Sequence, residues 1–123
     1  MKSDEAIEAE IVKKGKTAPR ITLAHIEATI ESTHYFSAMN GVDATLNGEG
    51  VASLGDTSRQ SLELLTFCVI VLKNGFTVTG ESACASPENF DPEIGKTIAL
   101  RKAMEKIWPL EGYLLRQRLI EEK

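Results

Sequence analysis

Residues 62–85 run LELLTFCVIVLKNGFTVTGESACA, and this stretch decides the fold. Its first part, Leu62 to Lys73, is rich in Val, Ile, Leu and Phe, which is typical of a buried strand. Asn74-Gly75 is the strongest short signal for a hairpin turn, and Phe76 to Ala85 follows as the return strand. The stretch therefore predicts an antiparallel β-hairpin at the centre of the molecule.

A two-residue turn would fix how the two strands pair. It places Lys73 opposite Phe76, and the pairing then runs backward one residue at a time. One face of the hairpin is then almost wholly apolar, and we expect a helix to pack on it. Its predicted members are Leu65, Phe67, Val69 and Val71, paired with Cys84, Ser82, Gly80 and Val78.

The other predicted face mixes apolar and polar side chains. Glu81 is expected opposite Cys68, with Thr79 beside it. This face is either half-solvated or meets a second subunit or a polar ligand. Cys68 and Cys84 fall on opposite faces in this register, which excludes a disulfide between them and indicates two small buried side chains.

Helices are predicted on both sides of the hairpin. Asp91, Pro92 and Glu93 form a typical helix start, and Pro109 ends that helix near Ile107 or Trp108. Further helices are expected from Ser3 to about Gly15, at 23–33 and at 110–122. Residues 37–61 are rich in Gly, Asn, Asp and Ser and predict a long loop, with a weak hairpin around Val42 to Leu46 and a turn at Asn47-Gly48.

These elements predict an α+β fold: N-terminal helices, an antiparallel β-hairpin sheet, a long helix packed on it and a C-terminal helix. A chain of 123 residues has room for one core. We therefore expect an N-terminal arm over residues 1–20 and a single α+β domain over 21–123, with the Gly-rich loop at about 37–61.

The predicted helix that begins at Asp91 contains a charge among apolar positions. At 100° per residue, Arg101 falls inside an arc formed by Ile94, Ile98, Leu100, Met104, Ile107 and Trp108, with Glu105 four residues further on. Arg101 and Glu105 either pair at the edge of the sheet or leave the guanidinium to bind an anion. Asn89, just before the helix, lies where an anion would be attracted, although Asp91 and Glu93 already occupy that end.

Composition excludes several classes of function. The chain has 14 Lys and Arg against 18 Asp and Glu, a net charge of −4, which argues against binding bulk nucleic acid. No apolar run approaches the length of a membrane span. His25 and His34 have no third partner at metal-ligand spacing, and no nucleophile or phosphate-loop motif is present. We therefore expect no enzyme activity and no cofactor.

The sequence resembles a family of small tailed-phage and prophage accessory proteins named after gene products forty-nine and sixty-six of two enterobacterial phages. The matching motifs are Leu72–Val78 (LKNGFTV), Gly80–Cys84 (GESAC), Ser86–Asp91 (SPENFD), Lys106–Leu115 (KIWPLEGYLL), Thr17–Arg20 and His34-Tyr35. The resemblance implies a phage origin, action in the host bacterial cytoplasm and no established enzymatic activity. More distantly, the architecture is similar to oligomeric sponge proteins that sequester cyclic signals, and no site residue is transferred from them.

The leading hypothesis is a counter-defence protein that binds and sequesters a small anionic ligand, such as a cyclic nucleotide or an ADP-ribose-type signal, as a homo-oligomer. In this hypothesis Arg101 binds phosphate, Phe76 or Phe90 stacks on a base, and Asn89 and Glu81 form hydrogen bonds, with Thr79 and Glu105 beside them. One alternative is an interaction module that inhibits a host protein through the Trp108-Pro109 corner and the C-terminal helix. The other is a structural phage component.

Overall fold

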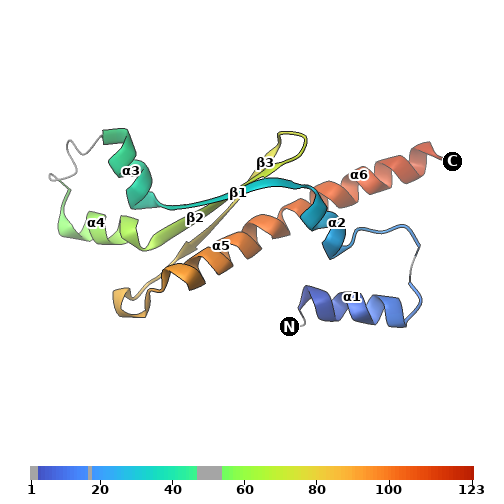
Figure 1. Cartoon of the computed structure of the whole chain (residues 1–123), viewed down its shortest axis with the longest axis horizontal. Coiled ribbons are helices and arrows are strands. Elements are labelled where there is room, and N and C mark those ends of the chain that lie inside the picture. Colours follow the sequence, from blue (N-terminus) through green and yellow to red (C-terminus); the bar gives the residue numbers. More distant parts are fainter. Residues whose placement is uncertain (1–2, 17, 47–53) are drawn as a thin grey trace.

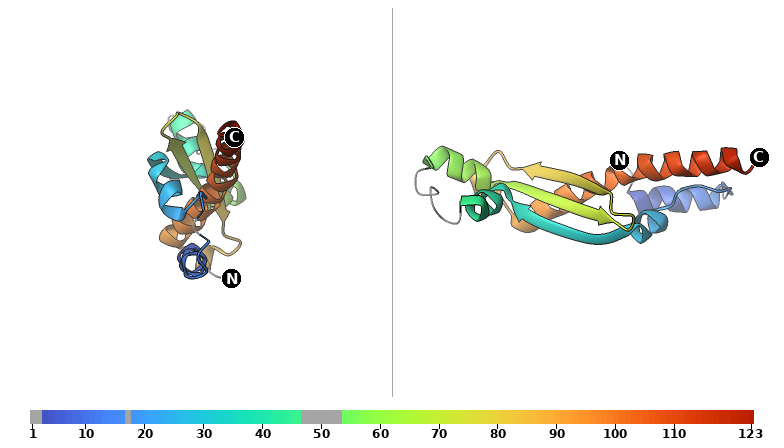
Figure 2. Two further views of the ribbon diagram at one scale, coloured as in Figure 1. Left: turned by 90° about the vertical axis from the view of Figure 1, so that its right-hand side faces the viewer. Right: turned by 90° about the horizontal axis from the view of Figure 1, so that it is seen from above.

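The computed structural model describes residues 3–16, 18–46 and 54–123, and it is an α+β structure, as predicted (Figure 1). The elements follow the order α1 (Asp4–Lys13), α2 (Leu23–Ala28), β1 (Ile30–Ser37), α3 (Ala38–Leu46), α4 (Asp56–Glu63), β2 (Leu65–Leu72), β3 (Thr77–Ala83), the 3-10 helix η2 (Pro87–Asn89), α5 (Pro92–Glu105) and α6 (Ile107–Glu121). The strands form one antiparallel sheet in the order β1-β2-β3. Helix α5 lies along one side of this sheet, and Figure 2 shows the strands uncovered on the other side.

The hairpin is confirmed, but its predicted register is wrong by one residue. The turn has three residues rather than two: the Leu72 N–H donates to the Phe76 carbonyl, and the Gly75 N–H donates to the Leu72 carbonyl. Gly75 adopts a φ of 90°, in the left-handed region that glycine tolerates best. In the resulting register Cys68 lies opposite Gly80. Because the pairing is shifted by one residue, Glu81 lies opposite Phe67 and not opposite Cys68.

The face that receives the helix carries the predicted side of β3 but the opposite side of β2 from the one predicted. Its members are buried and come from alternate positions of the two strands: Thr66, Cys68, Ile70 and Leu72 on β2, and Val78, Gly80 and Ser82 on β3. Phe67, Val69 and Val71, which we expected beneath a helix, are half-buried on the uncovered side. The prediction failed because it assumed a two-residue turn.

Both cysteines are free, although the predicted reason is wrong. Cys84 follows β3 and donates its N–H to the Leu64 carbonyl, which continues the buried alternation of the strand. The two cysteines therefore belong to the same side of the sheet. Cys68 lies opposite Gly80, four residues from Cys84, or about 13 Å along a strand. That spacing exceeds the reach of a disulfide, about 7 Å between Cα atoms.

The predicted helix at 23–33 is wrong in its second half. Thr22 caps α2, with its side-chain oxygen accepting from the His25 N–H, but the helix ends at Ala28. The chain then forms β1, which pairs with β2 along its length. Residues 30–37 contain β-branched and aromatic side chains that suit a strand, and pairing with an apolar neighbour outweighs the helical spacing.

The described part of the predicted loop at 37–61 is largely helical. Helix α3 replaces the expected hairpin around Val42 to Leu46, with Ser37 and Asn40 exchanging side-chain hydrogen bonds at its start. Helix α4 leads directly into β2. The predicted turn at Asn47-Gly48 lies outside the described residues.

The core forms where small residues let α5 approach the sheet closely. Gly95, Ala99 and Ala103, spaced four apart, are the buried residues of α5. They pack against the buried face of β2 and β3, where Gly80 leaves no room for a side chain beneath the helix backbone. The remaining core side chains are Ile26, Cys68, Ile70, Leu72, Val78 and Ile107.

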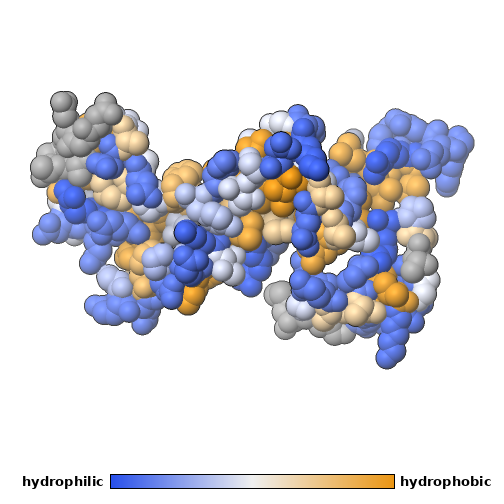
Figure 3. All heavy atoms as spheres, viewed as in Figure 1, coloured by the Kyte–Doolittle hydropathy of each residue, from blue (hydrophilic) through white to orange (hydrophobic). Residues whose placement is uncertain are grey.

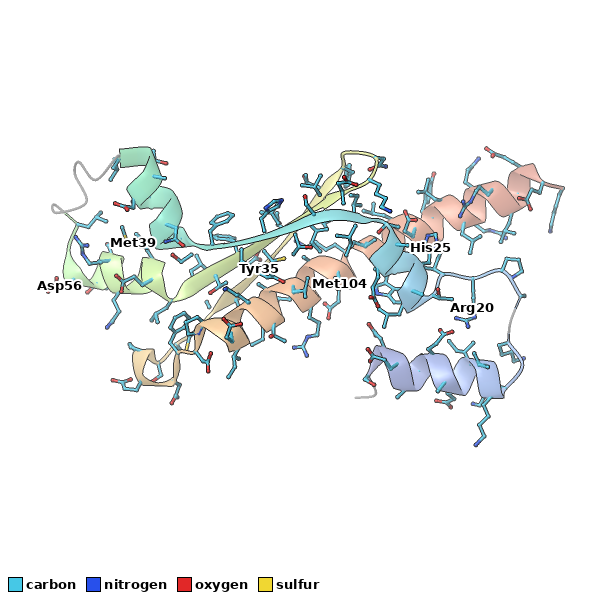
Figure 4. The ribbon with its side chains drawn as sticks, viewed as in Figure 1. Arg20, His25, Tyr35, Met39, Asp56 and Met104 are labelled. Atoms are coloured by element: carbon cyan, nitrogen blue, oxygen red, sulfur yellow. The ribbon has the colours of Figure 1, made fainter. Side chains whose placement is uncertain are left out.

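Two helices extend beyond the end of the sheet (Figures 1 and 2). Helix α5 ends at Glu105, slightly earlier than predicted, and α6 begins at once and includes Pro109 in its first turn, where a missing N–H costs little. At the same end, α1 has the predicted Ser3 cap and is held by two hydrogen bonds from Arg20 to Glu8, of 2.6 and 2.8 Å. His25 Nε2 on α2 lies 2.7 Å from Glu111 Oε1 on α6 and links those helices (Figure 4).

Candidate functional site

The arginine predicted to face the sheet does not do so. Arg101 is exposed, as are Glu105 and Ile94, because the side of α5 that meets the sheet is built from glycine and alanine. Of the predicted apolar arc, Ile107 is buried, and Leu100, Met104 and Trp108 pack against the core. The closest contact with the sheet, at Gly80, is nevertheless made by small residues that the prediction did not place there. Arg101 is therefore not a guanidinium held in an apolar cleft.

The predicted ligand-binding residues do not form one site. Thr79 and Glu81 alternate with the buried positions of β3, so they point away from α5 and from Arg101. Phe76 lies beyond the end of β3 at the hairpin turn, whereas Asn89 and Phe90 precede α5 at the opposite end of that strand. Phe76 and Phe90 line two different grooves.

The larger groove lies between the hairpin turn and the start of α6, and we call it the tip–α6 groove. It has a volume of about 740 Å³. Figure 3 shows hydrophobic side chains gathered over this region. Its lining residues are Leu72, Asn74, Phe76, Thr77, Val78, Thr79, Lys106, Pro109, Leu110, Glu111, Tyr113 and Leu114. Two predicted site residues, Phe76 and Thr79, are thus brought together, with partners from α6 that the ligand hypothesis did not include.

Large apolar side chains on the wall and rim of the tip–α6 groove are exposed. Tyr113 is 73% exposed, Phe76 55% and Leu114 48%. Leu110, Tyr113 and Leu114 follow the i, i+3, i+4 spacing that places side chains on one side of a helix. That spacing is visible in the sequence, but the hairpin turn that completes the groove is close only in the folded chain.

The local sequence explains how the tip–α6 groove is built. Asn74 Oδ1 accepts from the Phe76 N–H and shapes the turn that presents the Phe76 ring. On the other wall, Pro109 lies in the first turn of α6, and Ile107 is fully buried beneath the helix start. Helix α6 is therefore held at its start by Ile107 and projects from the sheet, with Leu110, Tyr113 and Leu114 exposed on one side.

A second groove, of about 460 Å³, lies between β1, α3 and the start of α5. Tyr35, Phe90 and Lys96 are among its lining residues, and the Lys96 ammonium lies 5.8 Å from the centroid of the Tyr35 ring. Figure 4 shows Tyr35 on β1. Burial raises the pKa of the Tyr35 hydroxyl, so this group is neutral and able to donate a hydrogen bond. The sequence argument had included only Phe90 from this groove.

Within residues 3–16, 18–46 and 54–123, no group of three or more His, Cys, Asp or Glu side chains could hold a metal ion. His25 is bonded to Glu111, and His34 Nε2 lies 2.9 Å from the Ser32 hydroxyl on the same strand. Burial raises the pKa of the Cys68 thiol, which opposes formation of the nucleophilic thiolate.

Comparison with known proteins identifies the family of this chain. Residues 21–119 match the model of the Phage protein (N4 Gp49/phage Sf6 gene 66) family, which is the family that the motifs resemble. The chain belongs to this family. It is therefore a phage protein, and the match covers every element from α2 to β3 and all of α5, together with most of α6. No curated protein and no solved structure matches it. Among the described residues of this phage protein, no helix is long and apolar enough to cross a membrane.

Proposed function

We propose that this phage protein is an accessory protein that works by binding a host protein in the bacterial cytoplasm, through the tip–α6 groove and the exposed side of α6. It acts by occupying its target and has no catalytic activity of its own. Its place in a phage family supports an accessory role. The observation that favours protein binding is the exposure of Phe76, Tyr113 and Leu114 around one groove.

A contiguous apolar surface of this kind is a typical feature of interaction sites. Tyrosine and phenylalanine are enriched at the centres of protein interfaces, where a few buried anchors supply most of the binding energy. The groove is open along α6, so its shape suits an amphipathic helix of a partner lying beside α6 with its apolar side inward. Lys106, which also lines the groove, supplies a polar contact beside that apolar centre.

The test is capture of a partner from host lysate by the purified, tagged protein, with variants on the two sides of α6. Leu114→Asp places a charge in the groove. Arg116→Asp is the matched control, because two residues turn an α-helix by about 200° and place this position on the opposite side. We expect a stoichiometric partner that binds the wild type and Arg116→Asp with equal affinity and Leu114→Asp at least about tenfold more weakly.

Contact at the groove is checked by replacing Tyr113 with a photoreactive residue. Cross-linking should attach the same partner at this position. A partner that binds Leu114→Asp as tightly as wild type, or does not cross-link at residue 113, would show that this surface is not used. Capture of no partner by a folded sample contradicts the proposal as a whole.

As a second proposal, we infer that the groove between β1, α3 and α5 binds and sequesters a small anionic ligand, such as a cyclic nucleotide or an ADP-ribose-type signal. Its support is the Lys96 ammonium, 5.8 Å from the Tyr35 ring centroid and 3.7 Å from Glu93, in a groove that Phe90 also lines. A cation with aromatic rings in one groove suits a base and a phosphate. Calorimetry with a panel of cyclic nucleotides tests it. Binding that is lost in Lys96→Gln supports the proposal, and no heat with any ligand contradicts it.

A further inference from the structure

Strand β2 is apolar on both of its faces, although α5 covers only one. Its sequence LTFCVIVL lacks the polar alternation expected where one face of an antiparallel strand is solvated. Its neighbour β3 has that alternation, with Val78, Gly80 and Ser82 buried and Thr77, Thr79 and Glu81 exposed between them. A near-continuous apolar run is typical of a strand that is covered on both sides.

We call the side of the sheet away from α5 the open face. The register gives its three rows: Phe36, Phe67 and Glu81; His34, Val69 and Thr79; and Ser32, Val71 and Thr77. The Phe36 and Phe67 rings lie 5.6 Å apart between centroids and form an aromatic pair. The open face therefore has an apolar centre along β2 and polar groups along β3 and on part of β1.

The surface area of the chain indicates that more of it is covered in use. The accessible surface is 8581 Å², whereas a compact monomer of 13.5 kDa exposes about 6,500 Å². The excess, roughly 2,000 Å² for one chain, is more than the roughly 800 Å² that each partner contributes to a standard interface. The projecting helices account for part of this excess, and the open face supplies a flat surface for a second layer.

We propose that the open face binds the open face of a second copy of this chain, forming a two-fold homodimer with two packed sheets. A two-fold axis along β2 brings Phe67, Val69 and Val71 of the two copies together as a shared core, with the sheets about 10 Å apart. The open face shares Thr77 and Thr79 with the tip–α6 groove, whose other lining residues lie outside the open face, so the dimer leaves most of that groove available. This inference does not rest on the proposed function.

The flanking strands meet each other under this symmetry, because a two-fold axis along β2 places β1 of one copy over β3 of the other. His34 of one copy then lies over Thr79 of the other, and Phe36 lies over Glu81. His34 is one row from that Glu81, so an imidazole lies near the carboxylate that the interface covers. Because the same patch serves both copies, one interface closes the assembly at two chains.

The test is the mass of the native protein in sedimentation and native mass spectrometry over a concentration series. Val69→Lys places an ammonium at the centre of the open face and is expected to raise the dimer dissociation constant at least about tenfold. Thr97→Lys is the matched control, because threonine has nearly the shape of valine and Thr97 is exposed on α5. His34→Asp is a second variant that leaves the apolar residues in place and sets a carboxylate near the partner's Glu81.

Circular dichroism establishes that each variant is folded; if Val69→Lys is not, His34→Asp decides. The inference predicts twice the 13.5-kDa chain mass for wild type, Thr97→Lys and Leu114→Asp, and monomers for the folded open-face variants. A wild type that stays monomeric at every concentration overturns it. So does a dimer that persists in the open-face variants or that dissociates in Leu114→Asp alone, because the last result would move the interface to α6.

Discussion

Replacing Gly80 by alanine should destabilise the protein more than any other glycine-to-alanine change in the described chain. An ideal Cβ at this position would overlap the Ala99 carbonyl oxygen and lie 2.5 Å from the Ala103 backbone nitrogen. Both atoms belong to the backbone of α5, so rotation of a side chain cannot relieve the overlap. Either the helix moves away from the sheet or the strand bends.

The size of the effect follows from that geometry. Overpacking a core costs about 1–3 kcal/mol, and a clash with helix backbone belongs at the upper end, so we expect a loss of about 3 kcal/mol. Unfolding entropy of about 2.1 cal/mol/K per residue over 123 residues converts this loss to a fall in Tm of about 12 °C. This is a large part of the stability of a domain, typically about 5–15 kcal/mol.

Substitutions at two other glycines, Gly95 and Gly112, should change the free energy of unfolding by different amounts and so give a graded series. A Cβ at Gly95 would lie 2.9 Å from the Thr66 hydroxyl oxygen, a side-chain atom that has some freedom to move, so Gly95→Ala should cost about 1 kcal/mol. A Cβ at Gly112 in α6 meets nothing within 4 Å, so Gly112→Ala should stabilise the helix by about 0.5–1 kcal/mol.

The assay is urea and thermal unfolding followed by circular dichroism. The expected order of stability is Gly112→Ala, wild type, Gly95→Ala and then Gly80→Ala. If Gly80→Ala unfolds at the wild-type midpoint, α5 does not lie against β3 at this distance. The description of the core, and with it the assignment of the open face, would then have to be abandoned.

Two further predictions concern the N-terminal helix and the cysteines. The Arg20 hydrogen bonds hold the pKa of Glu8 below its ordinary value. The stability that the pair contributes is therefore present above that ordinary value and is lost as pH falls through the lowered pKa. Amide exchange should show α1 detaching on acidification, and already at neutral pH in Glu8→Gln but not in Glu5→Gln. Burial raises the pKa of the Cys68 thiol, so alkylation followed by mass spectrometry should modify Cys84 before Cys68 in the native protein. After unfolding, both cysteines should react equally fast. Equal rates in the native protein would show that β2 is accessible.

Elements whose signals are local were predictable from the sequence. The start of α5 is one: Asp91 accepts hydrogen bonds from the N–H groups of Glu93 and Ile94, and Pro92 occupies the first turn, as its residue types predict. The existence of the β2–β3 hairpin is another, because Asn74-Gly75 between two apolar runs leaves few alternatives. In both cases the deciding atoms lie within a few residues of one another along the chain.

Elements decided by distant contacts were not predictable in the same way. Residues 30–33 continue the helical spacing of α2, yet they form a strand because β2 offers an edge with free hydrogen-bonding groups. Spacing along one segment carries no information about such a neighbour. The helices in the described part of 37–61 were missed for a related reason, since weak helix formers become helical when they pack on the end of the sheet.

The predicted binding site was wrong for two reasons. The hairpin turn is one residue longer than assumed, and a different side of α5 faces the sheet. A three-residue turn moves Val69 from the predicted core to the open face, and it moves Cys68 into the core. Assigning the large apolar residues of α5 to the core placed Arg101 beside the sheet, whereas Gly80 admits only glycine and alanine there. Because small residues make the contact between α5 and the sheet, the exposed large side chains of the chain lie outside that contact. Those on α6 and along the outer side of β2 remain available at the surface, and this is the physical reason for looking to these two surfaces for binding partners.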